Sequence, residues 1–211
     1  MKIERTPAGV LIHSALEYDL RWLVRSRGRE RAFRRHLLDL GRVVAGEAVL
    51  DVGCATGTLG LAARKRVGSA AAVHGVDPSP AMIERARAKA RRRRRTNVAF
   101  DVAIAQELPF EDRTFDVVFC TLVAHQLPHS DRRTCLAEMH RVLKPRGRLL
   151  LVDLALSRRP ADQPTPHGHG HFDVADLVPL LTETGFAVVA RGPVAFPLRR
   201  FDPLGYVLAA A

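Results

Sequence analysis

A short apolar strand that runs straight into a glycine-bearing turn constrains this chain more than any other feature. Residues 48–51 are Ala-Val-Leu-Asp, Gly53 and Gly57 follow, and residues 58–67 have helical character. Glycine lets the backbone approach a ligand where a Cβ atom would collide. A strand, a glycine turn and a helix in this order predict a ligand site at the carboxyl end of a buried parallel strand.

The rest of the chain continues this alternation. Further strands are predicted at residues 71–76, 97–103, 115–120, 148–153, 186–191 and 206–210, and further helices at residues 79–93, 131–144 and 173–185. Two amphipathic helices, residues 14–25 and 29–40, are predicted before the first strand. Strands that alternate with helices predict right-handed crossovers and a mainly parallel sheet covered on both faces, which is an α/β fold.

Length and composition fit one globular domain without covalent or metal staples. The chain has 211 residues, of which 47% are hydrophobic and 26% charged, both near the globular average. Cys54, Cys120 and Cys135 have no paired spacing, which argues against a disulfide framework or a zinc ribbon. The first residues lack the apolar core of a signal peptide, and no apolar run is long enough to span a bilayer. We therefore expect a soluble, cytoplasmic protein.

The charge of the chain leaves its partners open. A net charge of +11 permits attraction to nucleic acid, anionic lipid or acidic metabolites. Most of the excess is arginine, concentrated in residues 21–35 and 85–95. A solvated face is the simpler interpretation of these arginines, and contact with an anionic partner is the alternative. The apolar residues of the two N-terminal helices favour packing on the core over membrane contact.

An acidic residue ends the second predicted strand. Asp77 lies 20 positions after Gly57 (77 minus 57), where an acid can accept hydrogen bonds from both hydroxyls of a ribose above the turn. A dinucleotide site would need the spacing Gly-x-Gly-x-x-Gly, which residues 53–57 lack. Asp51, just before the turn, would repel a pyrophosphate but suits a ligand with an ammonium group and a sulfonium. The residues therefore favour a nucleoside site other than an NAD site.

Four segments follow one another in an order typical of one family. They are VLDVGCATGTL (49–59), VHGVDPSPAMIERARAKA (73–90), AQELPFEDRTFDVVFCTLVAHQLP (105–128) and AEMHRVLKPRGRLLLVD (137–153). From about Tyr18 to Leu154 the chain resembles class I S-adenosylmethionine-dependent methyltransferases, in the branch of the ubiquinone/menaquinone C-methyltransferases. The resemblance implies a Rossmann-like, doubly wound, mainly parallel seven-stranded sheet in the order 3-2-1-4-5-7-6, with the last strand antiparallel. It also implies an N-terminal helical segment, residues 1–45, that covers the active site, and a cofactor-binding methyltransferase domain, residues 46–211.

The resemblance further implies S-adenosylmethionine as the cofactor and S-adenosylhomocysteine as the product. The residues that would contact the methionine part are Asp51, Gly53, Cys54 and Gly57, with Thr121 at its border. Asp77 would bind the ribose hydroxyls. The residues that would surround the adenine are Pro78, Met82, Ile104, Ala105 and Gln106. Tyr18, with Asp19, resembles an element that closes over the cofactor, and no metal ligand is implied.

The chain departs from the family pattern at three positions. Ala55 replaces the middle glycine of the turn, a small change that we expect the turn to tolerate, and Arg146 replaces another turn glycine. Ile104 stands where many relatives have an acid that accepts a hydrogen bond from the adenine amino group. Losing that charge-assisted bond, about 1.5–3 kcal/mol if it is desolvated, predicts weaker cofactor binding or a replacement by Gln106 or a backbone carbonyl.

Histidines suggest both catalytic and metal-binding roles. His125 follows the fourth strand, where relatives often have a histidine pair facing the transferred methyl, and its ordinary pKa near neutrality suits a general base. A hydrogen-bonded structural histidine is the alternative. His167, His169 and His171 alternate with glycine in a predicted loop, residues 157–172, which suits a lid or rim, a metal site or neither.

The segment after the fourth strand indicates the class of acceptor. Residues 120–123 are Cys-Thr-Leu-Val, unlike the Asn/Asp-Pro-Pro-Tyr/Phe signature of enzymes that methylate exocyclic amino groups, and the chain has no Pro-Cys dipeptide. An enzyme that methylates a small molecule, as a monomer or homodimer, is therefore our leading hypothesis. Two alternatives stay open: an RNA or protein methyltransferase recruited through the arginines, and a non-catalytic cofactor-binding protein.

Overall fold

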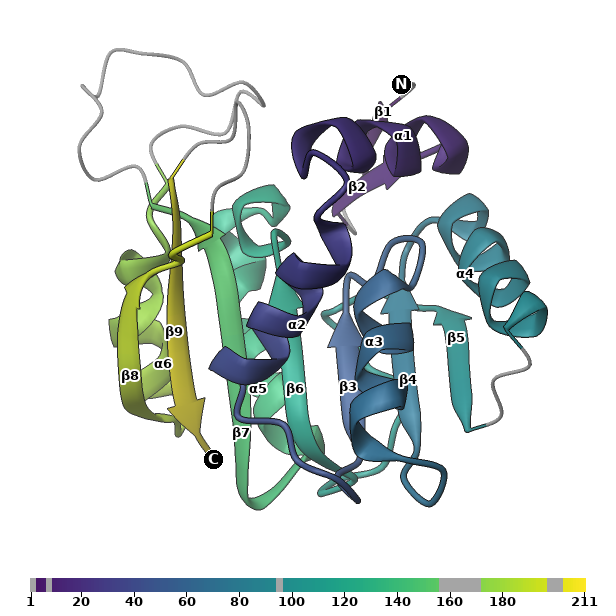
Figure 1. Ribbon diagram of the computed structural model, residues 1–211. Coiled ribbons are helices and arrows are strands. Elements are labelled where there is room, and N and C mark those ends of the chain that lie inside the picture. Colours follow the sequence, from purple (N-terminus) through teal and green to yellow (C-terminus); the bar gives the residue numbers. More distant parts are fainter. Residues whose placement is uncertain (1–2, 7–8, 94–96, 156–171, 197–202) are drawn as a thin grey trace.

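The computed structural model describes residues 3–6, 9–93, 97–155, 172–196 and 203–211. Within these ranges seven strands form one sheet in the order β5-β4-β3-β6-β7-β9-β8 (Figure 1). Counted along the chain from β3, this is the order 3-2-1-4-5-7-6. β9 is antiparallel to both of its neighbours, and the other pairs are parallel. The predicted fold class is confirmed.

The strands of the sheet lie close to the predicted segments. They are β3 (Val49–Val52), β4 (Val73–Asp77), β5 (Val98–Val102), β6 (Phe115–Thr121), β7 (Leu143–Leu154), β8 (Ala187–Pro193) and β9 (Leu204–Ala210). β3 is buried along its whole length because strands flank it on both sides and helices cover the sheet. Its single charged residue, Asp51, is therefore exceptional.

Helices cover both faces of the sheet. They are α1 (Ala15–Arg25), α2 (Glu30–Leu40), α3 (Thr58–Val67), α4 (Pro80–Arg92), α5 (Arg132–Val142) and α6 (Val178–Glu183), with 3₁₀ turns η1 (Ala124–Gln126), η2 (His129–Asp131) and η3 (Val174–Leu177). In Figure 1, α2 and α3 lie in front of the sheet, and α5 and α6 lie behind it. No helix in the described ranges is both long enough and apolar enough to cross a membrane.

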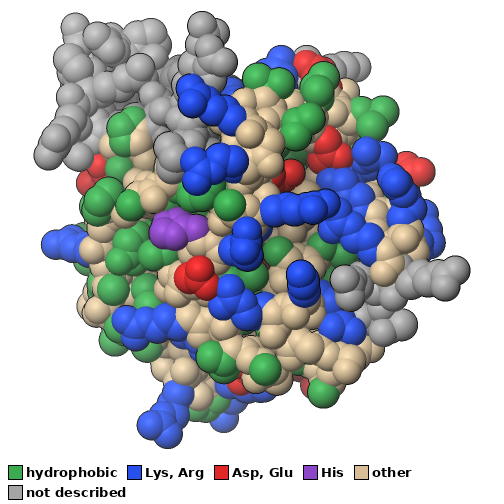
Figure 2. All heavy atoms as spheres, in the orientation of Figure 1, with side chains coloured by type: hydrophobic (Ala, Val, Ile, Leu, Met, Phe, Trp, Pro, Cys, Tyr) green, Lys and Arg blue, Asp and Glu red, His purple; other side chains and the backbone are tan. Residues whose placement is uncertain are grey.

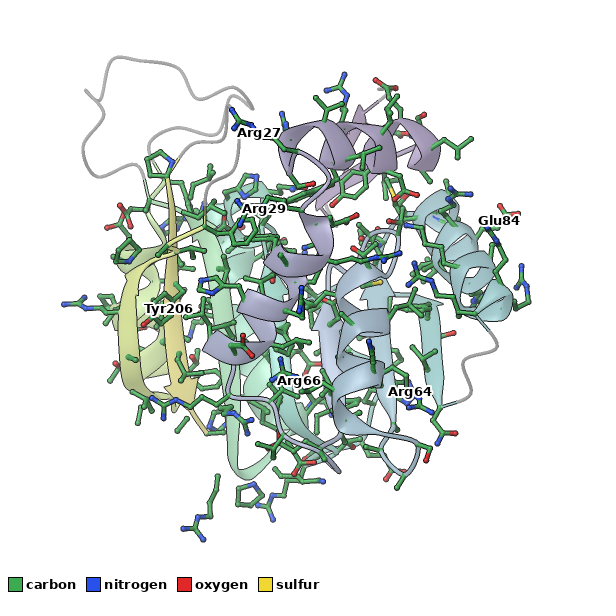
Figure 3. All side chains as sticks on the ribbon, in the orientation of Figure 1. Arg27, Arg29, Arg64, Arg66, Glu84 and Tyr206 are labelled. Carbon is green, nitrogen blue, oxygen red and sulfur yellow. The ribbon has the colours of Figure 1, made fainter. Side chains whose placement is uncertain are left out.

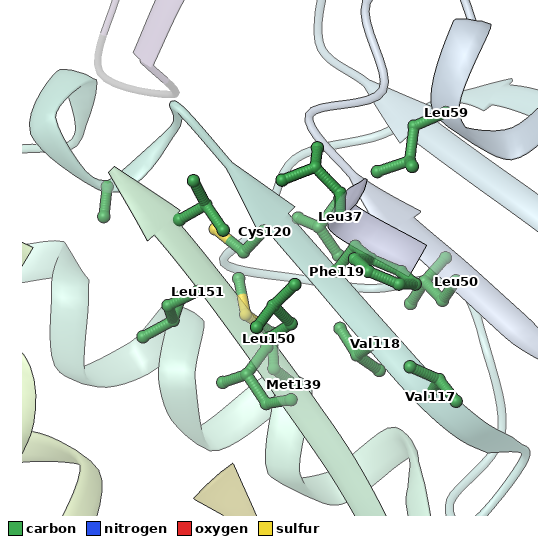
Figure 4. Close-up of a cluster of buried hydrophobic side chains, with 14 of the residues drawn as sticks. Leu37, Leu50, Leu59, Val117, Val118, Phe119, Cys120, Met139, Leu150 and Leu151 are labelled. Atoms are coloured by element: carbon green, nitrogen blue, oxygen red, sulfur yellow. The ribbon is translucent and has the colours of Figure 1, made fainter. Parts of the chain in front are cut away.

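The core forms where these helices meet the central strands. Phe119 of β6 is fully buried on the face of the sheet that α2 covers, beside Leu37 of that helix (Figure 4). Successive strand residues point to opposite faces, so the neighbouring Cys120 lies on the other side, near Met139 of α5. Each large apolar side chain buried in this way contributes about 1.5–3 kcal/mol. The core thus lies on both faces of the sheet.

The N-terminal segment contains the two predicted helices and one feature that was not predicted. α1 and α2 each begin one residue later than expected, and both end where they were expected to end. Before them, β1 (Ile3–Thr6) and β2 (Gly9–Ile12) form an antiparallel hairpin, so residues 1–45 are not wholly helical. Four-residue strands offer too little periodicity to be detected in a sequence. α1 lies above the carboxyl ends of the central strands (Figure 1).

Two other segments differ from expectation. α5 ends at Val142, and β7 begins at Leu143 and not at the predicted residue 148. Leu143 already pairs with Phe115 of β6, and after an irregularity in the register Arg148 pairs with Val117. The predicted helix at residues 173–185 divides into η3 and α6, since Pro179 cannot donate the hydrogen bond that would join them. The predicted loop at residues 157–172 lies outside the described residues except for its last member.

The glycine directly before α3 yields a stability prediction. Gly57 has a φ of +74°, and a Cβ atom there would lie 2.6 Å from the Phe100 ring and 2.8 Å from the Cβ of Ala86. We expect Gly57→Ala to lower the free energy of unfolding by about 2–4 kcal/mol, since backbone strain and overpacking act together. Gly46→Ala is the control, because its φ of +87° carries the strain with no atom within 4 Å of the added Cβ. If urea denaturation showed that Gly57→Ala and Gly46→Ala lower the free energy of unfolding equally, the packing argument would be contradicted.

Candidate functional site

The glycine turn between β3 and α3 is held against the next strand by backbone hydrogen bonds. The N–H groups of Gly53 and Cys54 both donate to the Val76 carbonyl of β4, at 2.8 and 2.9 Å. Gly53, Ala55 and Gly57 all have positive φ, of 72°, 47° and 74°. The turn accommodates Ala55 in this conformation at a cost of about 1–2 kcal/mol relative to a right-handed residue.

Asp77, at the end of β4, is joined to the same turn. Its Oδ2 accepts a hydrogen bond from the Ala55 N–H, and its Oδ1 accepts one from the Ser79 N–H, both at 2.9 Å. Burial raises the pKa of Asp77 to about 6, although both hydrogen bonds act to lower it. Each carboxylate oxygen has two lone pairs, so Asp77 keeps capacity to accept hydrogen bonds from a ligand.

Asp51, on the adjacent strand β3, is a second buried carboxyl group. It is 3% exposed, and its Oδ2 has no hydrogen-bond partner in the part of the chain that the structure describes. Burial, followed by the negative charge of Asp77, raises the pKa of Asp51 to about 7 against the opposing effect of Arg34. A buried acceptor with no partner is uncommon in a folded protein and marks a position where a ligand can bind.

Arg34 of α2 is a candidate that the sequence reasoning missed. It is 7% exposed, and its guanidinium carbon lies 4.6 Å from the centre of the Trp22 ring. One guanidinium nitrogen lies 3.4 Å from Glu30, but the buried Nε has no hydrogen-bond partner among the described residues. The charge of Arg34 lowers the pKa of Asp51, so this buried cation acts electrostatically on a buried carboxyl group whose Oδ2 also has no partner among the described residues.

A signal for Arg34 was present in the sequence. Helical spacing places it on the same side of α2 as Phe33, Leu37 and Leu38, and all four are buried. An arginine on the apolar side of a helix is rarely fully buried without a partner. It could therefore have been selected as a candidate site residue before the structure was known.

The element at Tyr18 and Asp19 ties α1 to the glycine turn. Asp19 accepts hydrogen bonds from Thr56 at 2.6 Å, Lys89 at 2.7 Å and Arg85 at 3.1 Å. Burial would raise the pKa of Asp19, but the hydrogen bonds from Lys89 and Thr56 hold it below the usual value. Tyr18 is half-buried beside this network, and burial raises its pKa to about 12. The two residues therefore lie where α1, α4 and the turn meet.

The residues after β5 include one amide that is held at one end only. Gln106 donates from Nε2 to Asp131 at 3.0 Å, whereas its buried Oε1 has no partner among the described residues. Ile104 pairs with Glu107 in a short bridge, and Ala105 is 8% exposed. The contact with Asp131 thus orients the Gln106 amide and leaves an acceptor in need of a donor.

The remaining predicted site residues lie at the same edge of the sheet or next to it. Thr121 ends β6, and its buried Oγ1 has no partner among the described residues. Met82 is buried at the start of α4, and Pro78 is half-buried just before that helix. Burial raises the pKa of the Cys54 thiol well above its ordinary value, so this cysteine has no thiolate character at neutral pH.

His125, in η1, is buried against a carboxylate. Its Nδ1 lies 2.6 Å from Asp153 Oδ1, and its backbone N–H donates to Asp153 Oδ2 at 3.2 Å. Asp153 is 1% exposed at the end of β7 and was not selected from the sequence. A carboxylate on Nδ1 fixes the orientation of an imidazole. This geometry suits either a base or a hydrogen-bonded structural histidine.

The structure gives no support to a metal site in the ranges it describes. No group of three or more His, Cys, Asp or Glu residues there could hold an ion. The histidines of the predicted loop lie outside the described residues, namely His167, His169 and His171. The interpretation of that loop as a lid, a metal site or neither therefore stays a prediction.

Comparison with known proteins identifies relatives for this site. Residues 49–147 match a family model described as a methyltransferase domain. A ubiquinone/menaquinone biosynthesis C-methyltransferase of Marinomonas sp. is 38% identical over 148 residues, which are 69% of this chain and 58% of that protein. An aklanonic acid methyltransferase of Streptomyces sp. is 38% identical over 54% of this chain and 51% of that protein. The chain spans between half and three fifths of the length of these two relatives.

Solved structures agree on the fold. A methyltransferase of Aquifex aeolicus dependent on S-adenosylmethionine has a TM-score of 0.74 and 23% identity, covering 92% of this chain and 97% of its own. A 4+2 cyclase also has a TM-score of 0.74, with 20% identity and coverage of 85% and 80%. Identities this low show the fold alone, and the cyclase demonstrates that the fold also serves other reactions.

The buried carboxyl groups predict how stability depends on pH. In the unfolded chain Asp51 has its ordinary pKa of 3.8, and in the folded chain about 7. Between these values the folded state binds more protons, so stability falls as pH rises. We expect Asp51→Asn to remove about 3 kcal/mol of the fall in the free energy of unfolding between pH 5 and pH 8.

Asp131→Asn is the control for this measurement. The hydrogen bond from Gln106 holds the pKa of Asp131 below its usual value. Asp131→Asn should therefore leave the fall in the free energy of unfolding between pH 5 and pH 8 unchanged. Urea denaturation of the ligand-free chain at several pH values gives both curves. Parallel curves for the wild-type chain and Asp51→Asn would show that Asp51 does not carry the dependence.

Proposed function

We propose that this chain, whose residues 49–147 match a model described as a methyltransferase domain, transfers the methyl group of S-adenosylmethionine to a small-molecule acceptor. The single observation that carries the proposal is a pair of buried polar groups without partners among the described residues, Asp51 on β3 and Arg34 on α2. Asp51 Oδ2 needs a donor and Arg34 Nε needs an acceptor. The amino-acid end of the cofactor carries an ammonium group, which can donate to Asp51, and a carboxylate, which can accept from Arg34.

The other site residues fit the nucleoside part. Asp77 would accept hydrogen bonds from the ribose hydroxyls while its bonds to Ala55 and Ser79 keep the carboxylate in place. The residues proposed to surround the adenine are Pro78, Met82, Ile104, Ala105 and Gln106. The ties from Asp19 to the turn and to α4 support the proposal that residues 1–45 cover the site.

Gln106 is the proposed replacement for the acid that is absent at position 104. Its Oε1 is buried and has no partner in the part of the chain that the structure describes, and the contact with Asp131 orients the amide. A carbonyl oxygen in this state can accept a hydrogen bond from an amino group such as that of adenine. The neutral bond would contribute about 0.5–1.5 kcal/mol, less than the charge-assisted bond that it replaces.

Methyl transfer from a sulfonium is an in-line displacement in which alignment and exclusion of water matter most. When bound, S-adenosylmethionine supplies the electrophilic methyl group. Thr121 would border the reacting end of the site, and His125 would either line the acceptor pocket or take a proton from the acceptor. The contact of His125 Nδ1 with Asp153 would orient the ring in either role.

The acceptor class rests on the names of the relatives. These proteins are a C-methyltransferase of quinone biosynthesis and an aklanonic acid methyltransferase, both of which are named for small molecules. The two other hypotheses, an RNA or protein methyltransferase and a non-catalytic binding protein, predict different results in the experiments below. Binding of S-adenosylhomocysteine without any turnover would favour the non-catalytic binding protein.

The role of Gln106 can be tested with a modified nucleoside. Wild-type protein should bind S-adenosylhomocysteine roughly 3- to 10-fold more tightly than S-inosylhomocysteine, which lacks the amino group, and Gln106→Met should lose this preference. Asp131→Ala, which keeps the amide but releases it, should lose less. Isothermal titration calorimetry measures all six affinities. An unchanged preference in Gln106→Met would assign the amino group to a backbone carbonyl.

Turnover can be tested without knowing the acceptor. We expect incubation with a cell extract and cofactor carrying a deuterated methyl group to label a compound of low molecular mass, detected as a gain of 17 Da by mass spectrometry (one CD₃ group in place of one hydrogen). Asp51→Asn should abolish the label because it removes the charge that meets the ammonium group. The small-molecule proposal would be contradicted if the label were found only in RNA or protein, and if the affinity for that macromolecule fell steeply with salt concentration.

A further inference from the structure

α1 has apolar residues on two opposite sides. Trp22 is 5% exposed and Tyr18 is half-buried, and together they form the side that packs on the protein. The other side carries four large apolar residues at helical spacing, which we call the outer stripe: Leu16 (67% exposed), Leu20 (59%), Leu23 (53%) and Val24 (62%). An exposed helix face of a globular protein is normally polar, so this contiguous stripe indicates a surface that meets something other than water.

Arginines accompany the outer stripe. Residues 14–35 contain seven arginines and three acidic residues, and no acidic residue lies between Asp19 and Glu30. The acidic residues are all paired: Glu17 with Arg21, Asp19 with Lys89 and Arg85, and Glu30 with Arg34. The local surface is therefore basic.

The figures show how these groups are arranged. In Figure 2, hydrophobic side chains gather over α1, with Lys and Arg side chains around them. In Figure 3, Arg27 lies at the end of α1 and Arg29 at the beginning of α2. Both arginines are exposed. Apolar and basic side chains thus lie together at this end of the molecule, with acidic side chains among them.

We propose that this surface docks on an anionic lipid bilayer, with α1 lying in the interface. Interfacial helices combine an apolar side that enters the acyl boundary with basic residues that attract anionic headgroups. α1 has 11 residues, which suits a helix that lies on a membrane and is far too short for one that spans it.

Charge selects this occupant over two others. A second copy of the chain would bring two basic surfaces together, each on a molecule of net charge +11, and like charges in contact oppose association. A nucleic acid would match the arginines but would leave the outer stripe in water. An anionic bilayer satisfies both the charge and the apolar surface.

Docking would also orient the molecule. α1 lies above the carboxyl ends of the central strands (Figure 1), so this edge of the sheet would face the bilayer. The docking proposal does not depend on methyl transfer, and the experiment that follows uses no acceptor and no turnover.

Flotation with lipid vesicles tests the proposal on the whole chain. We expect binding to vesicles of phosphatidylcholine with 40% phosphatidylglycerol, weaker binding in 0.5 M salt, and little binding to phosphatidylcholine alone. Leu16→Gln with Leu20→Gln should weaken binding at least about tenfold, and Arg21→Gln with Arg27→Gln also about tenfold.

Matched controls remove similar groups elsewhere. Val44→Gln with Val189→Gln removes two apolar side chains that are 57% and 50% exposed away from α1, and Arg91→Gln with Arg92→Gln removes two exposed arginines at the end of α4. Both controls should retain vesicle binding. Unchanged circular dichroism and unchanged affinity for S-adenosylhomocysteine would show that every variant is folded.

Three results would overturn the proposal. The first is no binding to anionic vesicles in low salt, and the second is equal loss in the test and control variants. The third is self-association in sedimentation that the outer-stripe variant abolishes while vesicle binding stays unchanged, since this would assign the stripe to a second copy. If instead vesicle binding behaves as expected and no extract compound is labelled, docking stands and the proposed function fails.

Discussion

Two carboxyl groups buried at the ends of adjacent strands are the feature on which the proposed site depends. Asp51 and Asp77 lie on β3 and β4, and burial raises the pKa of both. A sheet can keep such groups only where its own structure opposes the cost. Backbone N–H groups of the turn and of Ser79 meet Asp77, and the buried charge of Arg34 acts on Asp51. The fold therefore prepares an edge with unmet hydrogen-bonding capacity.

Two polar side chains, one after β5 and one after β6, are each held by a carboxylate. Gln106 is oriented by Asp131, and His125 is oriented by Asp153. In each pair a carboxylate holds one end of a polar side chain and thereby fixes the direction of the other end. Such support from neighbouring residues is what allows a site to bind a ligand with little reorganisation. Asp131 lies outside the four motifs that carry the family resemblance, whereas Asp153 is the last residue of the fourth motif.

The sequence predicted the sheet because each of its signals is local. A glycine turn after an apolar strand, or a proline that begins α4, depends on residues only a few positions apart. Contacts between distant segments were harder to foresee. Arg34 and Asp51 are 17 positions apart (51 minus 34), and Gln106 and Asp131 are 25 apart. The β1–β2 hairpin was missed because its strands are short, and β7 was predicted to begin at residue 148 because Pro145 and Gly147 suggest a turn.

The placement of β9 has a consequence for how the sheet comes together. β9 lies between β7 and β8, so β8 reaches the sheet only through β9. The two strands are antiparallel and close in the sequence, whereas β7 is separated from β9 by 49 residues (204 minus 154, less one). Hairpins form faster than contacts that must close long loops. We therefore expect β8 and β9 to join or leave the edge of β7 as one unit, while the half of the sheet that holds Asp51 and Asp77 forms without them.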